Sequence, residues 1–268
     1  MALYKAKRQD GNSYGNDFSR KGQLNMKFGY VYETGKRAEN EDALLFRCSL
    51  LSEGELWFAA VCDGMGGMKN GMEASAFCIR EMETWFDRQL IPCICEYGRH
   101  KGKLEQIIKS KGFMLYRQMN RDLFQKMRME GMAMGTTAMM CILYKERYYL
   151  FHIGDSRAYL LGRRMNSFLC KQITKDHGNE QGLSKCLGLN REWEPDFYSG
   201  NTGKKGLLLC TDGFYRKFDK NIWKRCLDVK KLKCETAIGK RLKEIAAYNT
   251  RQKEGDNISA IYMGGEGG

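Results

Sequence analysis

Residues 56–64 read Leu-Trp-Phe-Ala-Ala-Val-Cys-Asp-Gly, an apolar run that ends in a carboxylate. Seven consecutive apolar side chains predict a strand that is buried on both faces. A carboxylate at the end of such a strand is costly to bury unless it is paired, hydrogen-bonded or bound to a cation. Taken alone, Asp63 before Gly64 is more simply explained as part of a turn, because Asp-Gly is a common turn pair.

Other acidic residues stand at the ends of predicted strands in the same way. Asp155 follows the run 148–154, Asp212 follows 207–211, Asp256 precedes the last strand, and the pair Glu41-Asp42 precedes the second. Several such carboxylates together are harder to explain as independent turns. With no His or Cys ligand among them, they suit hard divalent cations such as Mg²⁺ or Mn²⁺.

This set of residues indicates phosphoryl chemistry. Two divalent cations a few ångströms apart can hold a phosphoryl group and lower the pKa of a water between them. Such a site also needs a cation for the phosphate oxygens. Arg37 lies four residues before Glu41, and a guanidinium suits the geometry of phosphate.

The hydrophobic pattern predicts an α+β fold in which helices cover antiparallel sheets. We expect strands over 26–33, 42–50, 55–62, 136–144, 147–153, 157–161, 167–174, 193–198, 206–210 and 257–263. Helices are expected over 71–90, with Pro92 marking the end, over the basic segment 99–128, and within 219–248. There is no repeat or low-complexity linker, so one domain over 26–268 is predicted after an N-terminal arm over 1–25.

The net charge of +13, from 45 basic and 32 acidic residues, is concentrated in two helical segments. Residues 99–128 contain nine basic and two acidic residues, and residues 216–243 contain eleven and three, so the remainder is slightly acidic. Neither segment interleaves aromatic residues in a stacking pattern. Solvated outer helix faces are therefore favoured over a nucleic-acid surface.

Composition excludes several other classes of protein. A content of 43% hydrophobic residues with two prolines excludes a mainly disordered chain. The longest stretch without a charged residue, 131–144, is shorter than the roughly 18 residues of a spanning helix. No secretory signal is evident, so a cytoplasmic protein is expected. The eleven cysteines are scattered, which predicts reduced, buried thiols and no zinc site at Cys93 and Cys95.

Six motifs in order resemble those of the protein phosphatase type 2C family, the metal-dependent serine/threonine phosphatases, in its bacterial form. They span about Lys27 to Met263, nearly the whole chain. Any single Asp-Gly is weak evidence, but six motifs in family order are specific. They are Arg37-Ala-Glu-Asn-Glu41-Asp42, Val61-Cys-Asp63-Gly-Met-Gly-Gly67, Gly135-Thr-Thr137, Gly154-Asp-Ser-Arg157, Leu209-Cys-Thr-Asp212-Gly-Phe214 and Gly255-Asp-Asn-Ile-Ser259.

The resemblance implies a four-layer α-β-β-α sandwich of two antiparallel sheets flanked by helices, with two Mn²⁺ or Mg²⁺ ions at one edge. By the same resemblance, Asp63 would bridge both ions and Arg37 would hold the substrate phosphate. The remaining residues would serve as follows: Glu41 and the Gly64 carbonyl on one ion, Asp212 and Asp256 on the other, Asp155 on a weaker third ion or in a turn, and Asp42 and Asn257 in support.

Two departures from the family pattern bear on mechanism. Met65 is common at its position in bacterial members, but Met68 stands where many of them have His, so the general acid is unassigned. A satisfied structural role is expected for His152 and His177. Only nine residues, 178–186, separate His177 from Leu187-Gly188, so the flap that usually follows is reduced to little more than a turn. Because a flap shapes substrate access and helps to hold the weakest ion, its reduction is expected to affect substrate selectivity and the binding of a third ion at Asp155.

Three functions remain open from the sequence. The leading one is an active protein phosphatase, expected to be a monomer, that acts on phosphorylated proteins, the products of a Ser/Thr kinase. The alternative is a weakly active or inactive relative that binds phosphoproteins as a regulator. A nucleic-acid binder using the two basic helices is disfavoured.

Overall fold

The computed structural model describes residues 3–4, 26–65, 69–131, 133–165, 167–179, 182–189, 192–203 and 205–265. Most of the predicted N-terminal arm lies outside these ranges. Its described part, β1 (Leu3–Tyr4), runs parallel to β3 (Asp42–Leu51). All other strand pairs in the described ranges are antiparallel.

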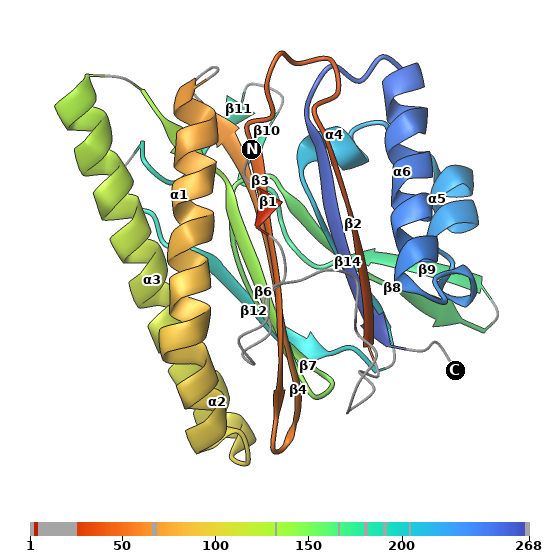
Figure 1. The fold of residues 1–268 in the computed structure, drawn as a ribbon, viewed down its shortest axis with the longest axis horizontal. Helices are drawn as coiled ribbons and strands as arrows, with labels where there is room; N and C mark the ends of the chain where they lie inside the picture. Colours follow the sequence, from red (N-terminus) through yellow and green to blue (C-terminus); the bar gives the residue numbers. More distant parts are fainter. Residues whose placement is uncertain are drawn as a thin grey trace.

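Within the described ranges the strands form two main sheets that pack face to face (Figure 1). The order of the first sheet is β1-β3-β4-β6-β7-β12, with β5 also paired to β4, and the order of the second is β2-β14-β13-β8-β9. Their bounds are β4 Gly54–Met65, β5 Gly135–Thr136, β6 Ala138–Tyr144, β7 Arg147–Ile153, β12 Asp196–Asn201, β2 Met26–Glu33, β14 Ile258–Gly265, β13 Gly206–Cys210, β8 Arg157–Arg164 and β9 Ser167–Gln172.

Helices cover the outer face of each sheet, which confirms the predicted four-layer α-β-β-α sandwich (Figure 1). The first sheet is covered by α1 (Lys69–Trp85) and α3 (Lys101–Glu130), with α2 (Ile91–Tyr97) between them. The second is covered by α5 (Lys220–Leu227) and α6 (Glu235–Arg251), and the short α4 (Asp212–Tyr215) follows β13.

Strand β4 is buried on both faces, which explains the apolar run in its sequence. Because side chains alternate across a strand, Phe58 packs under α1 whereas its neighbour Trp57 packs between the two sheets. Both side chains are almost fully buried. A strand covered on both faces must be apolar at every position, as residues 56–62 are.

The helix that was expected to end at Pro92 does not end there. The chain passes from α1 through a π-helical turn, Phe86–Leu90, directly into α2, and Pro92 stands in the first turn of that helix. The Ile91 N–H donates to the Phe86 carbonyl across the π-helical turn, so the helical backbone is continuous up to Pro92, which has no N–H of its own to donate. The strand expected over 136–144 is interrupted at Thr137, and the helical region expected within 219–248 consists of α5, a 3₁₀ turn and α6.

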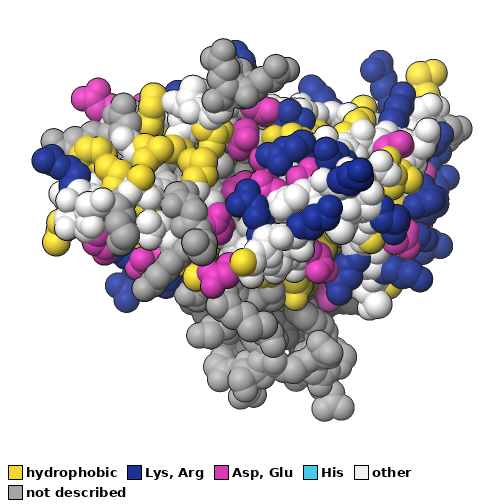
Figure 2. Space-filling view, turned by 90° about the horizontal axis from the view of Figure 1, so that it is seen from above, with side chains coloured by type: hydrophobic (Ala, Val, Ile, Leu, Met, Phe, Trp, Pro, Cys, Tyr) yellow, Lys and Arg dark blue, Asp and Glu magenta, His cyan; other side chains and the backbone are white. Residues whose placement is uncertain are grey.

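Both basic segments lie on the outer helical layers, as predicted (Figure 1). Figure 2, which looks onto one edge of the sandwich, shows Asp and Glu gathered near the middle and Lys and Arg over the side of α5 and α6. The charge of the molecule is therefore divided between an acidic edge and basic outer helices.

The eleven cysteines all lie in described ranges and are free thiols. Most are buried as predicted, but Cys95 and Cys234 are exposed. Among the helices that the structure describes, none combines the length and apolar character needed to cross a bilayer.

Candidate metal centre

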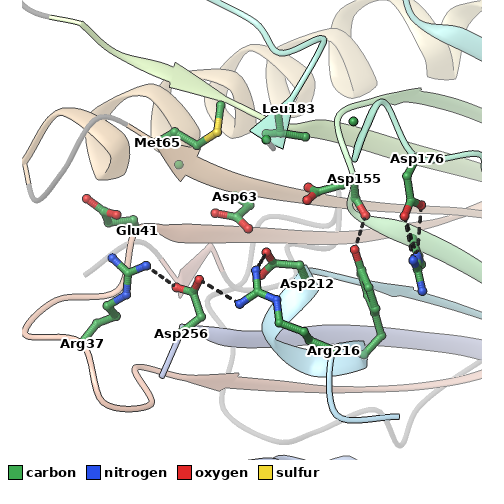
Figure 3. Close-up of a pocket in the computed structure, with 15 residues that line it drawn as sticks. Arg37, Glu41, Asp63, Met65, Asp155, Asp176, Leu183, Asp212, Arg216 and Asp256 are labelled. Carbon is green, nitrogen blue, oxygen red and sulfur yellow. Dashed lines mark hydrogen bonds and ion pairs between the residues drawn. The ribbon is translucent and has the colours of Figure 1, made fainter. Parts of the chain in front are cut away.

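The acidic residues predicted at strand ends line one pocket of about 740 Å³ at the edge between the two sheets (Figure 3). The first sheet contributes Glu41, just before β3, and Asp63 in β4. The second contributes Asp155 before β8, Asp212 after β13 and Asp256 before β14. Arg37 lines the pocket from the turn between β2 and β3.

Asp63 is held through its backbone by residues of two other motifs. Its N–H donates to Thr137 Oγ1 at 2.9 Å, and its carbonyl accepts from Thr137 N at 2.9 Å and from Thr136 Oγ1 at 3.0 Å. Thr137 Oγ1 in turn lies 2.9 Å from Ser156 Oγ, next to Asp155. Thr136 and Thr137 therefore hold the backbone of Asp63, and Ser156 holds Thr137, although none of these three side chains lines the pocket.

Gly64 is packed too closely for any side chain. A Cβ atom there would lie 2.1 Å from the Gly71 carbonyl oxygen in α1 and 2.7 Å from that of Glu41. The Gly64 N–H donates to the same Glu41 oxygen at 3.2 Å. This close approach brings the start of α1, the end of β4 and the residue before β3 to one point.

Asn257 connects Glu41 to Asp256, as a supporting residue would. Its Oδ1 accepts from Glu41 N at 2.9 Å, and its Nδ2 donates to the carbonyls of Thr34 at 2.8 Å and Glu39 at 3.0 Å. Its own N–H donates to Asp256 Oδ1 at 2.9 Å. The side chain is committed to these bonds and is not among those that line the pocket.

Asp42 lies behind the pocket between the sheets and is 2% exposed. It is directly opposite Asp63 in the pairing of β3 with β4, and its Oδ2 accepts from Thr211 Oγ1 at 3.0 Å. Burial raises the pKa of Asp42, and the nearby carboxylate of Asp212 raises it further. Asp42 thus joins the two sheets directly beneath the acidic cluster.

Burial also raises the pKa of four carboxylates at the front of the pocket, those of Glu41, Asp63, Asp155 and Asp212. The pKa of Asp63 stands well above its usual value, because it is buried and faces Asp42, Asp212, Asp256 and Asp155. Burial likewise raises the pKa of Asp212 against the opposing effect of Arg216. It raises the pKa of Glu41 against the opposing effect of Arg37. The cluster therefore strongly favours the arrival of positive charge.

The donor set fits divalent cations. Within the described ranges, Glu41 Oε1, Asp42 Oδ1 and Asp212 Oδ1 are buried carboxylate oxygens without a hydrogen-bond partner, a costly state that a cation relieves. As the side chains stand, no three Asp, Glu, His or Cys groups in the described residues surround a single ion position. Two of the carboxylates are instead paired with arginines: Asp256 with Arg37 at 3.0 Å, and Asp212 with Arg216.

Arg216 lines the pocket but belongs to none of the six motifs, and the fourth motif contains Arg157 without indicating its contacts. Arg157 contacts Asp176 through three bonds of 2.7–3.1 Å and stacks 3.8 Å from the Tyr215 ring centroid. The Tyr215 hydroxyl donates to the Asp155 carbonyl at 2.9 Å. The spacing of Arg216, four residues after Asp212, was the available signal for an ion pair within one helical turn.

A short hairpin stands in place of a long flap. Strands β10 (Gly178–Asn179) and β11 (Gly182–Leu183) form it, and Gly178, Gly182 and Leu183 line the pocket. Met65 also lines the pocket, whereas Met68 lies outside the described residues. The predicted reduction of the flap to little more than a turn is confirmed for the part of the hairpin that is described.

The two central histidines lie outside the pocket lining. His177 is satisfied as predicted: its Nδ1 accepts from Gly154 N at 3.1 Å and its Nε2 lies 3.2 Å from Asp196. His152 is fully buried, and its ring stacks on that of His177 at 5.0 Å. Among the described residues neither of its ring nitrogens makes a hydrogen bond of standard geometry, although the Ser156 backbone lies close enough to oppose the fall in its pKa. Burial and the neighbouring imidazole lower the pKa of His152 to about 4.

Comparison with known proteins agrees with this geometry. The family model described as protein phosphatase 2C matches residues 34–245. The serine/threonine phosphatase stp of Listeria welshimeri is 32% identical over 179 residues, which are 57% of this chain and 64% of that protein. The Listeria monocytogenes protein of the same name is 27% identical over 179 residues, again 57% of this chain and 64% of that protein.

Solved structures show the same fold. The serine/threonine phosphatase Stp1 from Staphylococcus aureus has a TM-score of 0.70 at 24% identity, covering 95% of this chain and 100% of the other. The catalytic domain of the phosphatase PstP, solved with two manganese ions, has a TM-score of 0.66 at 24% identity, covering 89% and 97%. The family-model match spans most of the sequence, and the fold and the order of the motifs agree with it. The chain therefore belongs to the protein phosphatase 2C family.

Proposed function

We propose that this protein is a metal-dependent phosphatase that removes phosphate from phosphoserine and phosphothreonine in proteins. The observation that carries the proposal is the convergence of carboxylates from both sheets on one pocket, with Arg37 at its rim. Membership of a protein phosphatase family agrees with it. A pocket of about 740 Å³ is large enough for a phosphorylated side chain.

The pocket residues divide into metal ligands and a phosphate-binding group. Asp63 would bridge two Mn²⁺ or Mg²⁺ ions, Glu41 and the Gly64 carbonyl would hold one, and Asp212 and Asp256 would hold the other. When bound, the two ions supply positive charge that lowers the pKa of a water and neutralises phosphate oxygens. Asp155 would hold a third, weaker ion.

Arg37 would bind the phosphate. Its side chain is 50% exposed at the pocket and pairs with Asp256 at 3.0 Å, so it stands beside the proposed ligands and can still be reached from solvent. A guanidinium donates two parallel hydrogen bonds to phosphate oxygens, which orients the group as well as attracting it. The physiological substrates would be proteins phosphorylated by a Ser/Thr kinase.

Metal removal tests the proposal. We expect protein stripped with EDTA to release phosphate from a phosphothreonine peptide at the background rate, because the buried carboxylates alone repel a phosphate. Adding Mn²⁺ should raise the rate by about a hundredfold or more, since each 1.4 kcal/mol of transition-state stabilisation is worth tenfold. Equal phosphate release in EDTA and in Mn²⁺ would contradict metal dependence.

The same assay separates the phosphatase from a phosphoprotein-binding regulator. A regulator would bind the peptide at saturating Mn²⁺, which fluorescence anisotropy would detect, without releasing phosphate. The phosphatase releases inorganic phosphate in proportion to enzyme concentration.

A further inference from the structure

Arg216 places a permanent positive charge among the carboxylates of the pocket. It follows α4 directly and points into the pocket between Asp212 and Asp256 (Figure 3). It pairs with Asp212, and its Nη1 lies 3.5 Å from Asp256 Oδ2. These two carboxylates are the proposed ligands of one ion.

A third carboxylate outside that ligand set holds the guanidinium in place. Glu254 is 3% exposed, and its Oε1 lies 3.3 Å from Arg216 Nη1. The same oxygen accepts from the backbone N–H groups of Gly255 at 2.9 Å and Asp256 at 3.2 Å. Glu254 is therefore fixed by the turn that precedes β14, and it holds Arg216 beside the acidic pair.

The other arginines of the pocket are placed differently. Arg157 is engaged by Asp176 and stacked on Tyr215, and in the described residues it has no ion pair with Asp212 or Asp256. Arg37 pairs with Asp256, on the side of that carboxylate that faces the turn between β2 and β3. Among the described residues that line the pocket, only Arg216 contacts both Asp212 and Asp256.

We propose that Arg216 is a positioning residue that competes with the divalent cation held by Asp212 and Asp256. This inference rests on the metal centre proposed above. Without metal, the guanidinium offsets part of the negative charge of the two carboxylates and keeps them close together. When the cation binds, both carboxylates give up their ion pairs with Arg216, and Glu254 retains the side chain nearby. Arg216 thereby weakens metal binding and stabilises the metal-free protein.

Arg216→Gln tests the inference by isothermal titration of EDTA-stripped protein with Mn²⁺. We expect the variant to bind Mn²⁺ about tenfold more tightly than the wild type, because a fixed charge that opposes the ion is removed. The melting temperature of the metal-free variant should fall, since Asp212 then loses its ion pair and only Arg37 offsets the repulsion between Asp212 and Asp256. Loss of a merely structural residue would weaken metal binding and would not strengthen it.

Lys217→Gln is the matched control, because it removes the same charge from the next residue, which does not line the pocket. Its Mn²⁺ affinity should equal that of the wild type. If metal-free Arg216→Gln does not fold, Arg216→Lys keeps the charge on a single ammonium group that cannot reach three carboxylates at once. Its affinity should lie above that of the wild type.

The outcomes distinguish this inference from the proposed function. Mn²⁺ binding of equal or lower affinity in the Arg216 variants would overturn the competition and leave the metal centre standing. A wild type that takes up no Mn²⁺ would overturn the metal centre and the inference together.

Discussion

Asp63→Asn is expected to reduce Mn²⁺-dependent phosphate release by about a thousandfold, equal to about 4 kcal/mol of transition-state stabilisation. Burial raises the pKa of Asp63 well above its usual value, and the other acidic side chains that it faces in the pocket raise it further. The amide has the same shape but no charge, so it cannot bridge two cations.

The fold of this variant should survive. The backbone of Asp63 is held by Thr136 and Thr137 through bonds that the side chain does not make. Removing one of several mutually repelling carboxylates should raise the melting temperature of the metal-free protein. Asp122→Asn, a charge removed from the exposed face of α3, is the matched control and should keep the wild-type rate. Wild-type activity in Asp63→Asn would refute the assignment of this pocket.

Gly64→Ala is expected to have the second largest effect, here on stability as well as activity. The added Cβ would meet two backbone oxygens, from Gly71 and Glu41, at distances no real contact reaches. Flexible side chains could give way, but backbone held by α1 and by the Gly64 N–H bond cannot. We expect the free energy of unfolding to fall by about 3 kcal/mol, at the upper end of overpacking costs.

Activity of Gly64→Ala should fall by about a hundredfold, because a shift of about 1 Å in reacting groups can cost that much. Urea denaturation and the phosphopeptide assay measure the two effects. Gly102→Ala, in α3 with nothing within 4 Å of the new atom, is the control. It should gain about 0.5–1 kcal/mol from the better helix propensity of alanine. If both substitutions changed the free energy of unfolding by similarly small amounts, the close packing of α1 against β4 at Gly64 would be contradicted.

The sandwich could be predicted because its signals are local. The strand β4 is apolar on both faces, and the helices α3 and α6 present apolar residues at helical spacing, so period and length identify each element. The prediction of a helix end at Pro92 was wrong because proline is found both after the last turn of a helix and in the first turn of one. Only the three-dimensional structure, with its continuous backbone through the π-helical turn, distinguishes the two cases.

The carboxylates of the site could also be predicted, because each ends or precedes a strand and their order follows the family motifs. The family resemblance also indicated Asp42 and Asn257 as supporting residues, but their partners could not be predicted, since these contacts join distant segments. Thr211 bonds to Asp42 across 169 residues, and Asn257 bonds to Glu41 across 216. Arg216 was missed for another reason: its role depends on Glu254 and Asp256, which the fold brings to it and which no spacing near residue 216 reveals.

His152 shows the limit of residue statistics. Buried histidines are usually hydrogen-bonded, and the ring of His177 meets that expectation through Gly154 and Asp196. His152 is buried in β7, where its ring stacks on His177 and the nearby Ser156 backbone makes no hydrogen bond of standard geometry with it. Which of the two rings would be satisfied depends on packing that the sequence does not record.

The position of metal in a crystal of the wild-type protein grown with Mn²⁺, located by anomalous scattering, tests the proposed centre most directly. We expect two peaks in this pocket, one contacting Glu41 and Asp63 and the other contacting Asp63, Asp212 and Asp256. A map without peaks in the pocket, or with manganese only elsewhere on the molecule, would contradict the proposed centre.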